Sequence, residues 1–482
     1  MINLQELAGC FINGDWSPSS SGAVFNIYNP ATAELLGTLP DCTADDAVRA
    51  VQSAYEAFAH WSVLPAKERS HHLKIWAQAI VENQLTLAEI MTLECGKPIR
   101  EAMGEVLYTA SYIEWFAEEA KRVRGDTIPH PSSDRRLFAL KQPVGVCTAI
   151  TPWNYPLVTL ARKCAPALAT GCTMVLKPAE ATPYSALALA RLAQQSGIPD
   201  GVINVVTTNR PEEVGQVLTT HPLVRKISFT GSTTVGKKLL KQAADTVKKA
   251  TMELGGNAPF IVFDDASLDK AVKGAMASKY RNTGQTCACA NRFLVQKNIA
   301  NDFATQLAEA SKKLIVGPGM EADTEQGPLI NQAALNKVER LVQDAKNKGA
   351  MVLTGGERHR LGGLYYQPTV IFDASCDMQL FNEEIFGPVA AIYTFETEAE
   401  AIQMANDTAY GLSAYLFTEN LSRMLRVSEA LQYGMVGVNE GVLSSEMAPF
   451  GGVKESGLGR EGSHYGIDEY LEVKYLCLGG LE

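Results

Sequence analysis

The chain has 482 residues, of which 46% are hydrophobic and 20% are charged, and its formal net charge is −10. A chain of this length buries a large core and is expected to contain more than one domain. The acidic balance argues against a nucleic-acid or anionic-membrane partner, since both attract concentrated positive charge. No apolar stretch approaches the roughly 20 residues that a membrane-spanning helix needs.

The 10 cysteines are scattered along the chain, and residues 1–16 show neither a secretory leader nor an Arg-rich transit peptide. Scattered thiols in a long chain without a leader are typical of reduced cysteines, not of a disulfide framework. We therefore expect a cytoplasmic protein, and we identify no metal-binding cluster.

The first third of the chain is predicted to be mainly helical. Residues 1–40 are expected to form short strands joined by turns. A helix is predicted from Thr43, because Thr43 is a suitable N-cap and aspartates 45 and 46 suit the positive end of the helix dipole. Apolar residues that recur near the 3.6-residue period predict further helices across Ala66–Glu94 and Pro98–Lys121.

The remainder of the chain alternates between short apolar runs and helical stretches. The first series of runs is 146–151, 172–176, 202–206, 226–230 and 250–254, separated by helical stretches near 158–169, 184–195, 211–219 and 233–244. This alternation is the signature of βαβ units and a parallel, doubly wound sheet. A second α/β series follows, with runs at 259–263, 292–295, 351–353, 389–395 and 435–439.

Two segments fall outside these series. Residues 122–143 contain several prolines and serines and then an extended run, which indicates either an arm that contacts another subunit or a surface loop. The tail 469–478 alternates polar and apolar residues like a strand.

A thiol and a carboxylate are the strongest candidates for catalytic groups. Cys287 lies among small and polar residues, and Gly284 and Ala288 leave room for its backbone to approach a substrate. Glu253 is a lone carboxylate at the end of an expected strand, 34 residues earlier. A nucleophile and a base are the groups that covalent acyl chemistry needs. A buried structural thiol is the alternative for Cys287.

Three further segments are candidates for ligand binding. Gly231 and Ser232 open a helix after a strand, where free N–H groups suit a phosphate, although the segment lacks the G-x-G-x-x-G pattern. Lys177 and Glu180 follow another strand, where Glu180 can accept hydrogen bonds from ribose hydroxyls and repel a 2′-phosphate. Asn154 carries an amide that can stabilise an oxyanion. The alternatives are a plain turn, a solvated ion pair and a turn asparagine.

Together these segments resemble the NAD(P)-dependent aldehyde dehydrogenase superfamily. The similar segments are MELGGNAP, NTGQTCACAN, TPWNYP, KPAE, FTGS and EEIFGPV, which occur in the family's order and span nearly the whole chain. The resemblance implies an α/β aldehyde dehydrogenase fold with a Rossmann-like cofactor domain, an α/β catalytic domain and a small β oligomerisation arm. It places these at 1–121 with 144–254, at 255–464, and at 122–143 with 465–482, and it implies a homodimer or homotetramer.

The resemblance also implies roles for individual residues. Cys287 matches the nucleophile, Asn154 the oxyanion-binding amide, and Glu253 the base that activates water for deacylation. Cys289, two residues from the nucleophile, is a candidate redox partner. The positions that match cofactor contacts are Trp153, Lys177, Glu180, Gly231, Ser232, Leu254 and Glu384. Glu180 favours NAD, with NADP as the alternative, because NADP-preferring relatives have serine there.

The implied substrate is a small aldehyde with a carboxylate at its other end. Arg162 and Arg281, with Ser444 beside them, match the group that binds this carboxylate in relatives, and paired arginines suit a carboxylate. Succinate semialdehyde, an intermediate of 4-aminobutyrate degradation, is the expected substrate. Glutarate semialdehyde and a broader set of aldehydes are alternatives, since one methylene changes binding by only about 1–3 kcal/mol. Two other hypotheses for the function are a non-catalytic relative of the family and a cysteine-dependent esterase.

Overall fold

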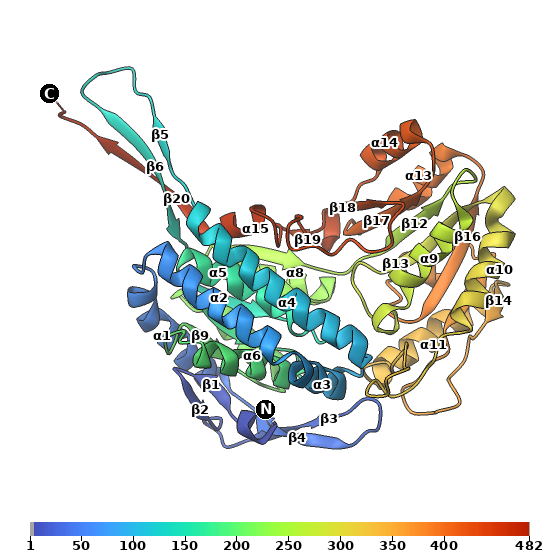
Figure 1. Ribbon diagram of the computed structural model, residues 1–482, viewed down its shortest axis with the longest axis horizontal. Helices are drawn as coiled ribbons and strands as arrows, with labels where there is room; N and C mark the ends of the chain where they lie inside the picture. The colour runs from blue at the N-terminus through green and yellow to red at the C-terminus, as the bar shows by residue number, and fades with distance from the viewer. Residues whose placement is uncertain (1–3, 482) are drawn as a thin grey trace.

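The computed structural model describes residues 4–481, and the first half of the chain is built on a long mixed sheet (Figure 1). In spatial order its strands are β19 (Gly457–Leu458), β11 (Lys249–Glu253), β10 (Val224–Thr230), β7 (Val146–Ile150), β8 (Thr173–Lys177), β9 (Ile203–Val205), β1 (Cys10–Ile12) and β2 (Asp15–Ser17). The strands from β11 to β9 run parallel, as the βαβ pattern predicts, and antiparallel strands close both edges.

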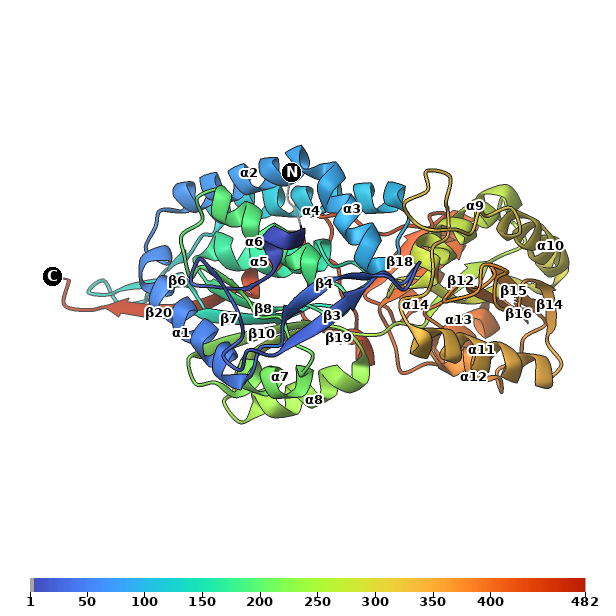
Figure 2. The same cartoon turned by 90° about the horizontal axis from the view of Figure 1, so that it is seen from below.

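Helices cover both faces of this sheet (Figure 2). One face carries α2 (Ala66–Glu82), α3 (Gln84–Cys95), α4 (Ile99–Glu119), α5 (Val158–Thr170) and α6 (Pro183–Gln195), and the other carries α1 (Ala44–Trp61), α7 (Pro211–Thr220) and α8 (Thr233–Ala244). The predicted start of α1 is confirmed, since the N–H of Thr43 donates to Asp46 Oδ2 at 2.9 Å. The helical region expected at 66–94 is divided into two helices at Asn83.

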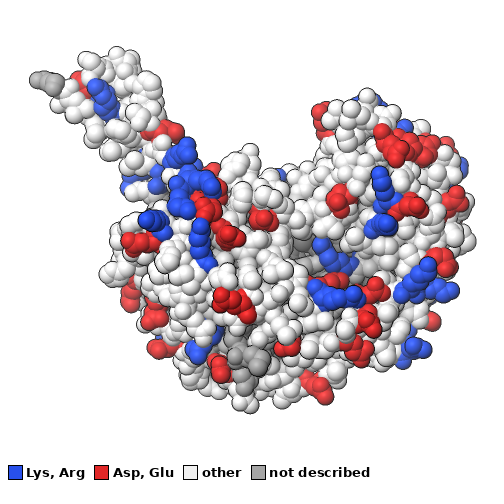
Figure 3. Space-filling view, viewed as in Figure 1, with Lys and Arg blue, Asp and Glu red and all other residues white. Residues whose placement is uncertain are grey.

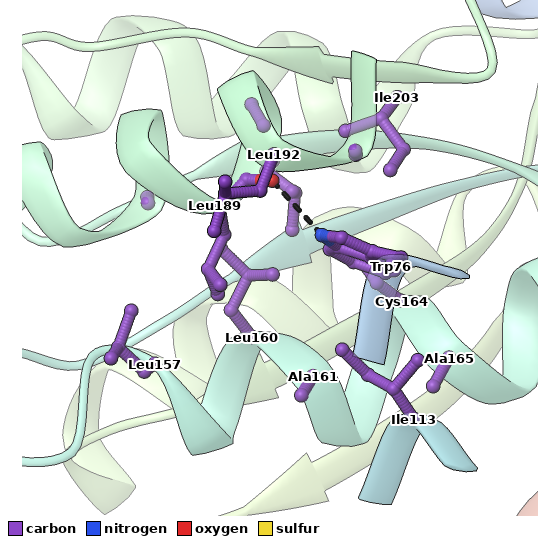
Figure 4. Packing of buried hydrophobic residues seen from close by; sticks show 14 of the residues in the cluster. Trp76, Ile113, Leu157, Leu160, Ala161, Cys164, Ala165, Leu189, Leu192 and Ile203 are labelled. Carbon is purple, nitrogen blue, oxygen red and sulfur yellow. Dashed lines mark hydrogen bonds between the residues drawn. The ribbon is translucent and has the colours of Figure 1, made fainter. Parts of the chain in front are cut away.

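The core between these helices is densely packed around Trp76. Its indole N–H donates to the carbonyl of Leu189 at 3.1 Å, so that its polar atom is satisfied inside the apolar cluster (Figure 4). Leu160 and Cys164 of α5 pack close by in the same cluster. Every residue of α5 is buried, which holds this helix rigidly against the sheet.

The second half of the chain forms another α/β layer structure. Its sheet has the order β14 (Met351–Thr354), β15 (Thr369–Phe372), β16 (Val389–Phe395), β13 (Ala290–Gln296), β12 (Ala258–Val262), β17 (Ser413–Phe417) and β18 (Met435–Val438), all parallel except β14. Its flanking helices are α9 (Leu268–Lys279), α10 (Ala300–Ser311), α11 (Gln332–Asn347), α12 (Gln379–Asn382), α13 (Glu398–Asn406) and α14 (Leu421–Ala430). The apolar runs at β15 and β17 were not among the predicted strands.

A β arm projects from the first half of the molecule (Figure 1). It consists of β5 (Asp126–Ile128), β6 (Arg136–Pro143) and the tail strand β20 (Leu471–Leu478), which pairs with β6 along its whole length. The remaining strands are the hairpin β3 (Val24–Tyr28) and β4 (Leu35–Pro40), and the remaining α-helix is the short α15 (Tyr465–Asp468).

The distribution of surface charge and the hydrophobicity of the helices are relevant to the kind of partner that the chain could bind. Acidic and basic side chains are interspersed over the face drawn in Figure 3. Within residues 4–481, no helix is both long enough and apolar enough to cross a lipid bilayer.

Candidate active site

The topology brings the candidate residues together where the two sheets face each other. The parallel strands of the first sheet have their carboxyl ends at one edge of the sheet. The segments that contain Leu254, Gly231 and Trp153 follow the ends of β11, β10 and β7 there. Open parallel sheets bind ligands at this edge. The second sheet presents its amino ends: β13 begins at Ala290, three residues after Cys287.

A cavity of about 630 Å³ lies at this junction. The predicted site residues that line it are Trp153, Asn154, Arg162, Gly231, Ser232, Glu253, Leu254, Arg281, Cys287, Glu384 and Ser444. Lys177, Glu180 and Cys289 do not line it. A cavity of this size and enclosure suits a small-molecule substrate with part of a cofactor.

A turn with left-handed backbone angles precedes the segment that carries Cys287. Asn282, Thr283 and Gly284 have φ values of 49°, 60° and 72°, and the N–H of Asn282 donates to Glu101 Oε2 at 2.8 Å. Non-glycine residues adopt such angles at a cost, which surrounding contacts must offset. We expected Gly284 to make room for a substrate, but that expectation is wrong. A Cβ there would lie 2.2 Å from the carbonyl oxygen of Gly387, so backbone packing requires the glycine.

The Cys287 thiol is held in its protonated form. Burial raises its pKa to about 12, and the positive charge of Arg162 acts in the opposite direction. Because the thiolate is the attacking species, the reaction needs a group that accepts the thiol proton when the carbon–sulfur bond forms.

Asn154 is fixed beside this segment. Its side chain is 5% exposed, and Nδ2 donates to the main-chain carbonyl of Gln285 at 2.9 Å. An amide nitrogen carries two hydrogens, so one remains for the cavity that Asn154 lines. This is the donor that an oxyanion at the reacting carbon requires.

Glu253 is an unpaired buried carboxyl group. It is 4% exposed, and its Oε2 has no hydrogen-bond partner within the described residues. Burial, followed by the charge of Glu461, raises its pKa well above the ordinary value, whereas Lys163 and Arg162 act against that rise. Lys163 itself donates to Glu461 and to Thr230. A buried carboxyl group with a raised pKa in a cavity is a strong candidate for a general base.

The two arginines lie in the same cavity and keep donors free. Arg162 donates to the Tyr108 hydroxyl at 3.2 Å and lies 3.9 Å from Glu461, while its Nε has no partner. Within residues 4–481, the Arg281 guanidinium makes neither an ion pair nor a hydrogen bond; it lies 5.9 Å from the Tyr155 ring centre. Arg281, a partly buried cation without a partner, therefore favours an anionic ligand, and the unpaired Nε of Arg162 offers a further donor.

The first turn of α8 provides a site for a phosphate. The Oγ of Ser232 accepts from the N–H of Val235 at 3.4 Å, and Gly231 and Ser232, at this end of the helix, line the cavity. Helix N-termini favour anions because of their free N–H groups and the helix dipole. Glu384 also lines the cavity, and its Oε1 accepts from the N–H of Gly256 at 2.9 Å.

The remaining predicted site residues lie just outside the cavity. Lys177, the last residue of β8, forms an ion pair of 2.5 Å with Glu180, and the Glu180 side chain is 36% exposed. Strand β8 lies next to β7 in the sheet. Cys289 is buried, and its thiol donates towards the carbonyls of Lys279 and Ala290. Cys287 and Cys289 are both free thiols.

Several cavity residues were not predicted from the sequence. They are Glu101, Glu105, Tyr108, Tyr155, Lys337, Phe386, Phe450 and Glu461. Glu101, Glu105 and Tyr108 lie on one helix, α4, at spacings of four and three residues that place them on one face, and this spacing was the available signal. The others come from separate helices and loops, and no local spacing indicates that they converge.

Comparisons with known proteins agree with this architecture. The aldehyde dehydrogenase family model matches residues 16–476. The mitochondrial succinate-semialdehyde dehydrogenase of Arabidopsis thaliana is 57% identical over 470 residues, which cover 98% of this chain and 89% of that protein. The NADP(+) succinate-semialdehyde dehydrogenase of Escherichia coli (strain K12) is 53% identical over 468 residues, covering 97% of each chain.

The solved structures lead to the same family. A crystal structure titled as an E. coli NADP-dependent enzyme superposes with a TM-score of 0.98 at 52% identity, covering 99% of this chain and 100% of that one. Two facing α/β sheets with a thiol, a carboxyl group and an amide at their junction have the groups that covalent acyl chemistry needs. The chain belongs to the aldehyde dehydrogenase family, which confirms the resemblance and the fold class predicted from the sequence.

Proposed function

We propose that this chain oxidises succinate semialdehyde to succinate, with NAD as its preferred cofactor. The observation that carries the substrate assignment is the pair of cavity arginines, Arg162 and Arg281, which retain free donors beside Cys287. The relatives named above as succinate-semialdehyde dehydrogenases support the same substrate. The bound substrate carboxylate would supply the negative charge that Arg281 lacks and would accept from the free Nε of Arg162.

The proposed first step forms a bond between the Cys287 sulfur and the aldehyde carbon. The thiol proton passes to solvent water, so that Glu253 remains available for the later hydrolysis. The aldehyde oxygen gains negative charge in the resulting thiohemiacetal, and the free N–H of Asn154 donates to it.

Oxidation of the thiohemiacetal leaves a thioester on Cys287. NAD, when bound, supplies the hydride acceptor for this oxidation. Residues of this chain that would hold it are Trp153, Gly231, Ser232, Leu254 and Glu384 at the cavity, with Lys177 and Glu180 at the adjacent strand end. The first turn of α8 fits the pyrophosphate group of either NAD or NADP.

Glu253 then serves as the base for deacylation. In its ionised form it takes a proton from a water molecule, and the hydroxide oxygen attacks the thioester carbon. The carbon–sulfur bond breaks, the carboxylic acid is released, and the Cys287 thiol is regenerated. The unpaired Oε2 of Glu253 is available for this water.

The substrate assignment is tested by comparing succinate semialdehyde, glutarate semialdehyde and butanal as substrates. We expect kcat/KM to be highest for succinate semialdehyde. We expect Arg281→Met or Arg162→Met to lower it by about 100-fold, as loss of a buried charge-assisted contact implies. Butanal, which has no carboxylate, is the matched control and should change little in the Arg281→Met variant. Equal values for all three aldehydes in the unaltered enzyme would contradict the assignment, and a higher value for glutarate semialdehyde would favour that alternative.

We further propose that the β arm mediates assembly into a homodimer or homotetramer. Strand β20 lies at an edge of the arm sheet, and Val473 and Tyr475 are 68% and 63% exposed. Exposed apolar residues on an open strand edge favour pairing with another chain. Light scattering of Val473→Lys/Tyr475→Lys should give the monomer mass, and an unchanged mass would contradict this proposal.

The proposed domain division follows the one predicted from the sequence: 1–121 with 144–254, then 255–464, with an arm of 122–143 and 465–482. The order of the sheets supports it, although β19 pairs with β11 across the division. A cytoplasmic location is proposed on the ten cysteines, all of which are free thiols. Cell fractionation tests this location.

A further inference from the structure

Lys97 is a fully buried lysine in the turn between α3 and α4. Its ammonium pairs with Glu105 of α4, donates to the main-chain carbonyl of Asn154 at 2.9 Å and lies 3.8 Å from the Tyr155 ring centre. Burial is the largest influence and acts to lower its pKa, but the interactions with Glu105, Tyr155 and Cys95 together outweigh burial, and the pKa is raised. A cation is therefore held against Asn154.

The second oxygen of Glu105 binds the start of helix α5. Its Oε1 accepts from the N–H groups of Leu157 and Val158, at 3.1 and 3.2 Å. A carboxylate at this position satisfies free N–H groups and interacts favourably with the helix dipole. The ion pair thus holds the segment 154–158 at both ends, through the carbonyl of Asn154 and the first amides of α5.

This segment carries the groups on which the chemistry depends. The side-chain amide of Asn154 projects from one end of it, and Arg162 lies one helical turn beyond the other end. Asn282 adds a second donor, at 3.0 Å, to the same Asn154 carbonyl. We propose that Lys97 and Glu105 are positioning residues, which together set the place of the Asn154 amide relative to Cys287. This inference rests on the proposed role of Asn154 in the oxidation.

The attraction between the two charges by itself gains little stability over apolar packing of similar volume. Apolar side chains, however, cannot donate to the Asn154 carbonyl or accept from the α5 amides. The specific effect of the pair is therefore the orientation of the 154–158 segment, and orientation errors of about 1 Å can cost 100-fold in rate.

Three variants separate positioning from folding. Lys97→Met leaves the Glu105 charge buried without its partner, while Lys97→Met/Glu105→Gln removes both charges. Lys226→Met is the matched control, because Lys226, on strand β10, is equally buried. Its ammonium donates to Thr251 Oγ1 at 3.0 Å and lies 3.8 Å from the Glu469 carboxylate. For each variant we would measure the rate constant of the NADH burst per titrated Cys287 thiol, the Kd for NAD and the thermal unfolding midpoint.

We expect both Lys97 variants to lower the burst rate constant by about 10- to 100-fold while the Kd for NAD stays unchanged. The double variant should regain thermal stability relative to Lys97→Met, yet its burst should remain slow. Lys226→Met should lose stability and retain the burst rate constant of its folded sites.

A folded Lys97 variant with an unaltered burst rate constant would overturn the inference. So would a burst that recovers together with stability in the double variant, because that result describes a purely structural ion pair. The comparison uses whichever aldehyde the unaltered enzyme oxidises best. A failure of the succinate semialdehyde assignment would therefore appear in the unaltered enzyme, separately from any failure of the positioning role.

Discussion

The side-chain amide of Asn154 donates a 2.9 Å hydrogen bond to the carbonyl of Gln285, two residues before Cys287. This bond joins the segment after β7 of the first sheet to the nucleophile segment before β13 of the second. The junction of the two sheets is thereby held at the point where the proposed oxyanion donor and the thiol must act together. The energetic value of this arrangement is that the donor is oriented before the substrate arrives.

Asn154→Ala removes both the oxyanion donor and this bond. We expect the burst rate constant with succinate semialdehyde to fall by about 100- to 1,000-fold, as for the loss of one oxyanion donor. Rapid-mixing measurements of NADH formation give this value. Alkylation of Cys287 by iodoacetamide, followed by peptide mass spectrometry, is the control for an intact thiol environment. An unaltered burst in the variant would exclude Asn154 as the donor.

Glu253→Gln removes the proposed base but keeps the shape of the side chain. Thioester formation should persist, so a burst of NADH is expected, followed by steady-state turnover slower by about 100-fold or more. Stopped-flow absorbance separates the two phases, and Cys287→Ala serves as the variant without either phase. If the burst itself disappears, Glu253 is also needed as the acceptor of the thiol proton.

The charge of Glu461 contributes to the raised pKa of Glu253, after burial. The ionised form is the base, so kcat should rise with pH as Glu253 loses its proton. Glu461→Gln removes a like charge and releases Lys163, and both changes favour ionised Glu253. The rising limb of the kcat–pH profile should therefore move to lower pH in the variant. A limb that stays in place or moves upward would contradict the assignment of that limb to Glu253.

Glu180→Ser tests the cofactor preference. A carboxylate at this strand end accepts from ribose hydroxyls and repels a 2′-phosphate, so its loss should raise kcat/KM for NADP relative to NAD. The Lys177 side chain, freed from its 2.5 Å ion pair with Glu180, would then be available to a phosphate. Initial rates with both cofactors provide the measurement, and Glu212→Ser, on the exposed start of α7, is a control. An unchanged ratio would show that other residues decide the preference.

Much of the fold was predictable because its signals are local. The alternation of apolar runs and helical periods between 145 and 254 reflects strands and helices that each bury one side, and the structure contains these elements in order. The short strands β15 and β17 were missed, since brief apolar runs have no period that distinguishes them. The requirement for glycine at position 284 was also misread, because the carbonyl of Gly387 that imposes it lies 103 residues away.

The sequence by itself determined the family and the candidate thiol, base and amide. Each of Cys287, Glu253 and Asn154 lies in a short continuous segment whose composition can be recognised without the fold. Only the tertiary structure decided which charged groups surround them. Lys97 and Glu105 reach the site from one segment and Glu461 from another far along the chain, and the charge of Glu461 adds to the effect of burial on the pKa of Glu253. Charge interactions act through space, and an effect that depends on distance and on exclusion of water cannot be read from residue order alone.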